Sequence, residues 1–507
     1  MKTILKSNNI RKVILQHFCF SHLQHVRFIL LASVLFSLAA YPLQSQEVSR
    51  SEPPQPGPPL TLTLPAVQHF QLSNGVPVTM MQQHKVPLVE IYVIVKAGIV
   101  MDTPQKSGLA SITASMLDEG AGSRNALQFA DAVDFLGADL FARAGFNTTT
   151  IALHTPLSKL DSAMVLLSDM VLRPTFPAEE LERVRTSLLT TLIQWHDEPR
   201  VIASVLLNNE LYGEKHPYGR PAIGTEKSIR SFQVADLKNF HSTYFRANNA
   251  DIVVVGDIDQ ETIQPKLEKA FGKWESGKIP APELPPIHAV KKRRIYIVDK
   301  AGAPQSEIRI GSIGAPRLTD EYYDLVVLNT ILGGSFTSRL NQNLREVHGY
   351  TYGAGSRFYF RELPGPFIAA SAVQTAVTDS ALYQFMYELN GIRMPVPENE
   401  LDRAKNYVAL GFPENFETVS SIANQLSELV FYGLPDNYFN DYIQHILGVT
   451  DKGVQQAADK YIIPDKMDVV IVGDRKAIAE KVKALNLGPI KFMTIDQVLG
   501  PVPKMNR

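Results

Sequence analysis

The sequence predicts an α+β protein made of two homologous halves, each a mixed sheet with helices packed on one face, as in a duplicated α/β roll. Three observations predict this architecture. Short apolar strands and longer helical periods follow one another in both halves. A proline-rich stretch, residues 276–292, separates two parts of similar length. Two segments of the first part recur in the second at nearly equal distances.

The first 46 residues are predicted to be a signal peptide. An apolar stretch, residues 28–40, follows a basic segment that contains no acidic residue. The stretch is too short to span a bilayer and ends in small residues, so cleavage is expected between residues 40 and 46. This predicts a periplasmic or secreted protein without a stable membrane span after cleavage; an uncleaved membrane anchor is the alternative.

Removal of the signal peptide would leave no cysteine, because Cys19 is the only one in the chain. The mature protein would then depend on core burial and not on disulfides or thiolate metal sites. The whole chain has 50 Lys and Arg and 51 Asp and Glu. Five of the basic residues and none of the acidic residues lie in the predicted signal peptide, so the remainder has a formal charge of −6. That charge disfavours nucleic acid and anionic lipid as partners.

The remainder is predicted to contain a linker and two domains. Residues 47–65 are rich in proline and polar residues, which favours an extended linker. The first domain is predicted to span residues 66–275 and the second residues 293–500, joined by the linker of residues 276–292.

The internal repeat is the main evidence that the halves are homologous. Residues 244–257 (YFRANNADIVVVGD) align without a gap with residues 461–474 (YIIPDKMDVVIVGD), 217 positions later. Residues 172–185 (LRPTFPAEELERVR) align with residues 392–405 (IRMPVPENELDRAK), 220 positions later. The first pair predicts a buried strand closed by Gly-Asp, and the second a proline before the acidic start of a helix.

The pattern also predicts individual elements. Strands are expected at residues 87–95 and 294–298, and a strand pair is expected within residues 139–154. Helical periods predict helices at residues 108–117, 126–136, 159–172 and 177–195.

Residues 108–117 (GLASITASML) resemble the zinc-binding helix of the pitrilysin (insulinase-type) peptidase family, which carries Gly-Leu-Ala-His-x-x-Glu-His-x-Leu in this frame. In that family the two histidines hold zinc, and the glutamate activates the zinc-bound water. Here Ser111, Ala114 and Ser115 fill these positions, and Thr191 fills that of the third ligand. Hydroxyl and methyl groups are poor zinc ligands, so we expect neither metal nor other cofactor in this chain.

Two other interpretations of this region are less favoured. His154, His196 and Asp197 are potential replacement ligands, but ordinary surface or hydrogen-bonded side chains are the simpler interpretation. Ser111 or Ser115 as a nucleophile would need a general base and an oxyanion hole, and the flanking sequence indicates neither.

Residues 328–340 (LNTILGGSFTSRL) and 344–353 (LREVHGYTYG) resemble the signature of the family's second half. The resemblance assigns a catalytic and substrate-binding role to Arg345 and Tyr352, which would hydrogen-bond the peptide near the scissile carbonyl. It also implies substrate contacts for Gly333 and Gly334. Structural roles in a helix cap, a strand and a turn are the alternatives.

The resemblance covers residues 66–495 and implies that the chain forms half of a clamshell. It implies a zinc-less subunit of a pitrilysin-type metallopeptidase, inactive alone, that contributes substrate-binding and transition-state-stabilising residues to a His-x-x-Glu-His partner acting on extended peptides. The alternatives are a non-catalytic periplasmic protein that binds peptides by strand addition, or a structural core-type subunit. The sequence does not indicate which peptides are preferred.

Overall fold

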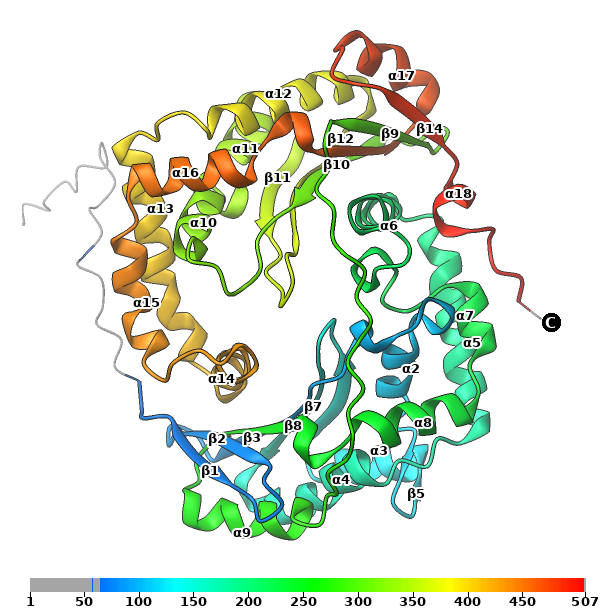
Figure 1. Ribbon diagram of the computed structural model, residues 1–507, viewed down its shortest axis with the longest axis vertical. Helices are drawn as coiled ribbons and strands as arrows, with labels where there is room; N and C mark the ends of the chain where they lie inside the picture. The colour runs from blue at the N-terminus through cyan, green and yellow to red at the C-terminus, as the bar shows by residue number, and fades with distance from the viewer. Residues whose placement is uncertain (1–56, 58–63, 506–507) are drawn as a thin grey trace, which may run out of the picture. The chain divides into compact units, whose positions relative to one another are not determined.

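The computed structural model describes Gly57 and residues 64–505 of the chain (Figure 1). The predicted signal peptide, with Cys19, lies outside these residues, as does most of the predicted linker 47–65. In the part of the chain that the structure describes, no helix is both long and apolar enough to cross a bilayer.

The described residues form an α+β fold with two mixed six-stranded sheets, which confirms the predicted fold class. The first sheet has the order β1-β2-β8-β3-β7-β6, in which only β2 and β8 run parallel. Its strands are β1 (Gln68–Gln71), β2 (Pro77–Gln82), β3 (Leu88–Val95), β6 (Asp139–Ala144), β7 (Thr149–Pro156) and β8 (Ala250–Gly256).

The second sheet repeats this topology. Its order is β11-β12-β10-β13-β9-β14, so β9, β13, β10, β12 and β11 correspond to β2, β8, β3, β7 and β6. Its strands are β9 (Arg294–Asp299), β10 (Gln305–Ile313), β11 (Thr351–Phe358), β12 (Pro366–Gln374), β13 (Asp468–Gly473) and β14 (Ile490–Met493). A short separate ladder joins β4 (Gly120–Ala121) and β5 (Arg124–Asn125).

The helices lie between these strands along the chain, mostly in runs of several consecutive helices. Those of the first half are α2 (Leu109–Ser115), α3 (Ala126–Phe135), α4 (Leu160–Leu172), α5 (Ala178–Trp195), α6 (Pro199–Tyr212), α7 (Glu226–Ser231), α8 (Val234–Tyr244) and α9 (Gln260–Phe271). Those of the second half are α10 (Tyr322–Asn329), α11 (Arg339–Asn341), α12 (Thr378–Gly391), α13 (Glu398–Gly411), α14 (Val419–Tyr432), α15 (Tyr438–Leu447), α16 (Asp451–Tyr461), α17 (Arg475–Ala484) and α18 (Ile495–Leu499).

The repeated sequence segments form equivalent elements. The repeated apolar runs become β8 and β13, in which every residue is buried, as expected for strands covered on both faces. The repeated Pro-acidic segments open α5 and α13, with Pro177 and Pro397 at the N-caps. Acidic residues in the first turn of each helix favour this start, because they complement the positive end of the helix dipole.

Each sheet is covered on one face by helices of its own half. Apolar residues of α4 and α9 pack with those of the first sheet in one cluster, and residues of α12 and α17 pack with those of the second. The opposite face of each sheet is covered by a single helix from the other half, which the sequence did not predict. Figure 1 shows α6 beside the second sheet and α14 beside the first.

The exchanged helices are equivalent positions of the repeat and bury apolar side chains. Ile202, Leu206 and Leu207 of α6 share a cluster with residues of the second sheet that include Tyr296, Val298, Val470 and Val472. A Cβ on Gly311 of β10 would lie 3.0 Å from a methyl carbon of Leu207, so the missing side chain permits this close approach. The two halves therefore share their cores.

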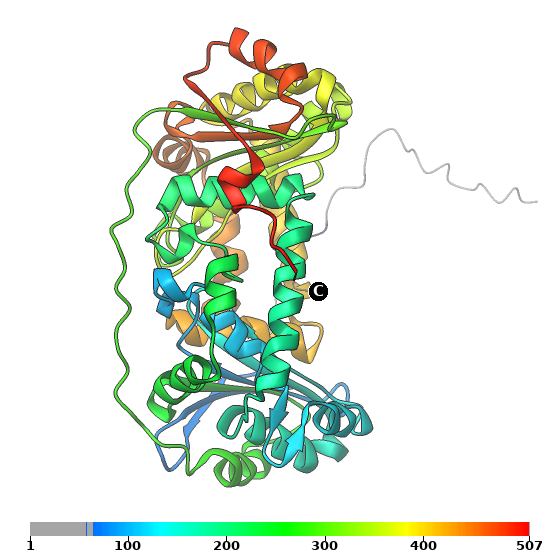
Figure 2. The ribbon, with the colours of Figure 1, turned by 90° about the vertical axis from the view of Figure 1, so that its right-hand side faces the viewer.

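A long extended connection joins the halves. Residues 272–293 contain neither helix nor strand, and Figure 2 shows this segment running from α9 to β9 along one side of the structure. The predicted linker, residues 276–292, lies within it. The domain limits themselves stay a prediction.

Candidate functional site

Helix α2 keeps the frame of a zinc-binding helix without its ligands. The Ser111 hydroxyl donates to the carbonyl oxygen of Ala222 at 2.7 Å. Ala114 is buried and Ser115 is exposed. On α5 the Thr191 hydroxyl donates to the carbonyl oxygen of Ser187, one turn earlier. The available donors are therefore neutral hydroxyls, of which two are already engaged with the backbone, and this set does not fit zinc.

Close packing and buried hydrogen bonds hold the N-terminus of α2 in place. Gly108 precedes the helix with a φ of 90°, and a Cβ there would lie 2.5 Å from the carbonyl oxygen of Ile223. The buried carboxylate of Asp102 accepts from the backbone N–H groups of Gly108 and Ala110 at 2.8 and 2.9 Å. Burial raises the pKa of Asp102 to about 7, although both donors act to lower it.

The two histidines considered as replacement zinc ligands, His196 and His154, contact other groups in the structure. The His196 ring nitrogens lie 2.9 and 3.0 Å from the carbonyl oxygens of Leu192 and Gly500. His154 Nδ1 lies 2.6 Å from a carboxylate oxygen of Glu90. Among residues 64–505, no group of three or more His, Cys, Asp or Glu side chains is placed to hold a metal ion.

The glycine pair of the second half lies in a π-helical segment, Thr330–Gly334, against β11. A Cβ on Gly333 would lie 2.2 Å from the backbone nitrogen of Ser356, and one on Gly334 would lie 2.6 Å from the side-chain nitrogen of Asn329. Close packing therefore accounts for both glycines, and their predicted contact with substrate stays a prediction.

Arg345 belongs to a second π-helical segment, Gln342–Val347, a geometry that is frequent at functional sites. Its guanidinium carbon lies 4.6 Å from the centre of the Phe336 ring, which is itself exposed. Its Nε lies 3.4 Å from the carboxylate of the adjacent Glu346, and 37% of the Arg345 side chain is exposed. The guanidinium thus keeps donors that face solvent.

Tyr352 projects from β11, an edge strand of the second sheet, and is 91% exposed. The pairing of β11 with β12 is irregular between Thr351 and Ala354, so Tyr352 lies in a bulge. The Thr351 hydroxyl donates to the carbonyl oxygen of Ala372 at 2.7 Å and fixes this irregularity. No hydrogen bond or cation–π contact joins Arg345 to Tyr352 within the described residues, and both side chains have donors exposed to solvent.

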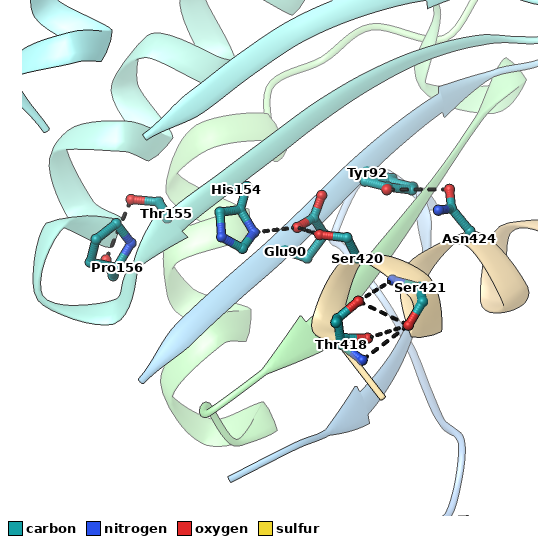
Figure 3. A network of polar contacts seen from close by, with 9 residues as sticks. All are labelled: Glu90, Tyr92, His154, Thr155, Pro156, Thr418, Ser420, Ser421 and Asn424. Carbon is teal, nitrogen blue, oxygen red and sulfur yellow. Dashed lines mark hydrogen bonds and ion pairs between the residues drawn. The ribbon is translucent and has the colours of Figure 1, made fainter. Parts of the chain in front are cut away.

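A polar network that the sequence did not predict joins the first sheet to α14 (Figure 3). Glu90 of β3 is 3% exposed, and its carboxylate accepts from the Ser420 hydroxyl at 2.7 Å in addition to contacting His154. The Tyr92 hydroxyl donates to Asn424 at 3.3 Å. Burial, reinforced by the charge of Glu90, raises the pKa of Tyr92. A glutamate within the apolar run LVEIYVIV is the sequence signal for this network.

A cavity of about 740 Å³ adjoins this network. It is open beside β6, whose Asp139, Phe141 and Arg143 line it on alternate positions of the strand. In the described chain, β6 has a strand partner on one side only, so its outer backbone groups are available for pairing.

Two family models match the chain. One, described as Insulinase (Peptidase family M16), matches residues 78–226, and the other, described as Peptidase M16 inactive domain, matches residues 231–408. The structure is similar to the crystal structure of a peptidase M16 inactive domain from Pseudomonas fluorescens, with 27% identity, a TM-score of 0.75, and coverage of 80% of this chain and 98% of that chain.

Curated relatives differ in the activity that their names give. The chain is 26% identical to a non-peptidase homolog, YmxG, from Helicobacter pylori, over 81% of this chain and 95% of the relative. It is 29% identical to an uncharacterized zinc protease, YmxG, from Bacillus subtilis, over 56% of this chain and 68% of the relative. The duplicated fold and both family matches agree: the chain belongs to the peptidase M16 (insulinase) family.

Proposed function

We propose that this chain is the zinc-less subunit of an M16 peptidase and lends Arg345 and Tyr352 to a zinc-bearing partner. Two observations support this assignment of the zinc site to a partner and of the two hydrogen-bond donors to this chain. The first half has only serine, alanine and threonine at the zinc-site positions, and the hydroxyls of Ser111 and Thr191 donate to backbone carbonyl oxygens. The second half keeps the arginine and the tyrosine of the family's other signature.

The exposure of Tyr352 is the observation that carries the proposal. A tyrosine kept for packing would bury its ring, whereas this one is 91% exposed. The Arg345 guanidinium contacts the exposed Phe336 ring and lies 3.4 Å from the Glu346 carboxylate. Both side chains are therefore free to donate to a substrate held against this face.

The chemistry of the two donors suits peptide hydrolysis. A partner subunit with His-x-x-Glu-His would supply the Lewis acid and the activated water when it carries zinc. The phenol of Tyr352 and the guanidinium of Arg345 would donate hydrogen bonds to the scissile carbonyl oxygen as negative charge develops on it. The present chain alone would bind peptide without cleaving it.

The test is a peptide-cleavage assay on a complex of this chain with a homologous His-x-x-Glu-His subunit. We expect no turnover by this chain alone and turnover by the complex. Arg345→Ala and Tyr352→Phe in this chain should each lower kcat by about a hundredfold or more, as expected for loss of a donor to a developing oxyanion.

Matched controls separate this role from general damage to the fold. Arg403→Ala and Tyr407→Phe change exposed residues of α13 outside the signature, and both should leave kcat unchanged. Normal turnover by complexes that carry Arg345→Ala and Tyr352→Phe would refute the donated-residue role.

A second candidate function is peptide binding without cleavage. The free edge of β6 and the cavity beside it favour this alternative, because an extended peptide can add to a sheet edge and place alternate side chains into an adjoining pocket. Peptide binding by the isolated chain, together with failure to activate any zinc-bearing homologue, would favour this candidate over the subunit role.

Export through the signal peptide of residues 1–46 is part of the proposal, and places the complex in the periplasm or outside the cell. N-terminal sequencing of the protein recovered from those compartments would test it. A mature chain that starts between residues 41 and 47 is the expected result, and a chain that retains residue 1 would contradict it.

A further inference from the structure

A second cavity, of about 590 Å³, lies where the two halves meet. Its wall comprises the segment that joins β11 to β12, the C-terminal half of α14, and residues 146–150 before and at the start of β7. Three of the lining residues are arginines, and seven others are aromatic, namely Phe146, Tyr322, Phe358, Tyr359, Phe360, Phe431 and Tyr432.

Arg361 is the central side chain of this cavity. Its guanidinium carbon lies 3.7 Å from the centre of the Phe146 ring and 4.5 Å from that of Tyr218, so both rings hold it in place. Its Nη1 atom is buried and has no hydrogen-bond partner. A buried guanidinium ordinarily has an acceptor or an ion-pair partner, because removing its charge from water is unfavourable. In the described structure the Arg361 side chain is half-buried, and its Nη1 atom has no acceptor.

The charges around Arg361 leave the cavity cationic. Among the ion pairs of residues 64–505, neither Arg357 nor Arg361 has a carboxylate partner, whereas Arg317 is paired with Glu428 at 2.5 Å. The other nearby carboxylate, Glu362, accepts from the Asn147 side chain at 2.6 Å. Burial lowers the pKa of Arg361, and the largest electrostatic influences that oppose this come from tyrosines and not from a carboxylate.

The cavity continues toward the free edge of the first sheet. It shares Thr148, Thr150 and Ser427 with the larger cavity beside β6. A peptide that pairs with β6 therefore has a path along which its end, or a side chain near its end, reaches the arginines. A guanidinium fork is the side-chain group best matched to a carboxylate, since it donates two parallel hydrogen bonds.

We propose that Arg361 and Arg357 form a binding pocket for a carboxylate of a peptide, either the C-terminal carboxylate or an acidic side chain near the C-terminus. The inference rests on the proposed function in one respect, the handling of extended peptides. It adds a recognition site in this chain that is separate from Arg345 and Tyr352. Binding an anion would give the Arg361 guanidinium the acceptor that it lacks.

The test is isothermal titration calorimetry on the isolated chain with three N-acetylated peptides that share one serine- and alanine-rich sequence. The first ends in a free carboxylate, the second in an amide, and the third in a glutamate followed by an amide. We expect the second peptide, which has no carboxylate, to bind at least about tenfold more weakly than the first, the third or both. The reason is that it cannot form the charged hydrogen bonds with the arginines. The better-bound acid identifies the source of the carboxylate.

Two variants assign the effect to the pocket. Arg361→Met should abolish the preference for a carboxylate, and Arg357→Ala should weaken it, whereas Arg403→Ala on exposed α13 should change nothing. Urea unfolding separates binding from folding. Arg361→Met removes a half-buried charge that has aromatic contacts but no ion-pair partner among the described residues, and the methionine side chain keeps contact with the two rings, so stability should change little. A purely structural Arg361 would instead give lower stability with unchanged preference.

Equal affinity for all three peptides, or a preference that persists in Arg361→Met, would overturn the inference. So would the absence of measurable binding by both acids. These outcomes are independent of the peptidase proposal, because the binding measurements need neither a partner subunit nor turnover. The peptidase proposal is tested separately, by the kcat of the complex.

Discussion

We predict that His216→Asn removes the loss of stability that protonation of His216 causes in mild acid. His216 follows α6, the helix that packs on the second sheet, and it is fully buried. Its Nδ1 accepts from the backbone N–H of Tyr218 at 3.0 Å, a role that only an unprotonated nitrogen can fill. Its ring stacks on Tyr212 with centroids 5.4 Å apart.

These surroundings favour the neutral ring. Burial lowers the pKa of His216 to about 4 from the usual 6.5, and the positive charges of Arg220 and Arg361 act in the same direction. Because the folded-state pKa lies below the unfolded-state pKa, the contribution to stability is fully present above pH 6.5 and is lost as the pH falls toward 4. The gap between the two pKa values corresponds to about 3 kcal/mol in all, of which about 2 kcal/mol is lost by roughly pH 5.

The assay is urea unfolding of the wild-type chain and of His216→Asn at a series of pH values between roughly 4 and 8. Asparagine keeps an acceptor for the Tyr218 N–H and does not titrate. It leaves some space unfilled, which lowers stability by a constant amount at every pH. The difference between the two curves removes the contribution of all other titrating groups. A difference that stays flat below pH 6.5 would refute the role assigned to His216.

The remaining predictions concern stability and use urea or thermal unfolding. Glu90→Ala should lower the free energy of unfolding by about 2–4 kcal/mol, because His154 and Ser420 of α14 both lose their buried hydrogen-bond partner. A loss below about 0.5 kcal/mol would contradict the structural role of the network. Gly311→Val should cost about 1–3 kcal/mol, since the new side chain meets Leu207, and unchanged stability would argue against that close contact. Tyr352→Phe should change stability by less than about 0.5 kcal/mol, because the hydroxyl is exposed, and a larger loss would indicate a structural role.

Much of the fold could be predicted from local sequence. The two copies of the apolar run before Gly-Asp predicted buried strands, and β8 and β13 are equivalent central strands of the two sheets. The two Pro-acidic segments predicted helix starts that the structure confirms at Pro177 and Pro397. These signals are local, because a buried strand and a helix N-terminus each impose their own residue pattern.

The exchange of α6 and α14 could not be predicted in this way. Both helices have apolar faces, with Leu207 and Leu426 among their buried residues, but an apolar face does not specify which sheet covers it. The same limit applies to the candidate sites. The sequence motif predicts a role for Arg345 and Tyr352, which stays a prediction. The cavity around Arg361 depends on residues that are far apart along the chain and meet only in the folded structure.

The most direct test of the account is the turnover number of the complex at saturating peptide, measured with this chain either unchanged or carrying Arg345→Ala and Tyr352→Phe together. The account predicts a complex that retains its zinc and its assembly but loses kcat by at least about a hundredfold when both donors are removed. Equal turnover with and without the two side chains would contradict it, because the subunit would then contribute nothing to the reaction.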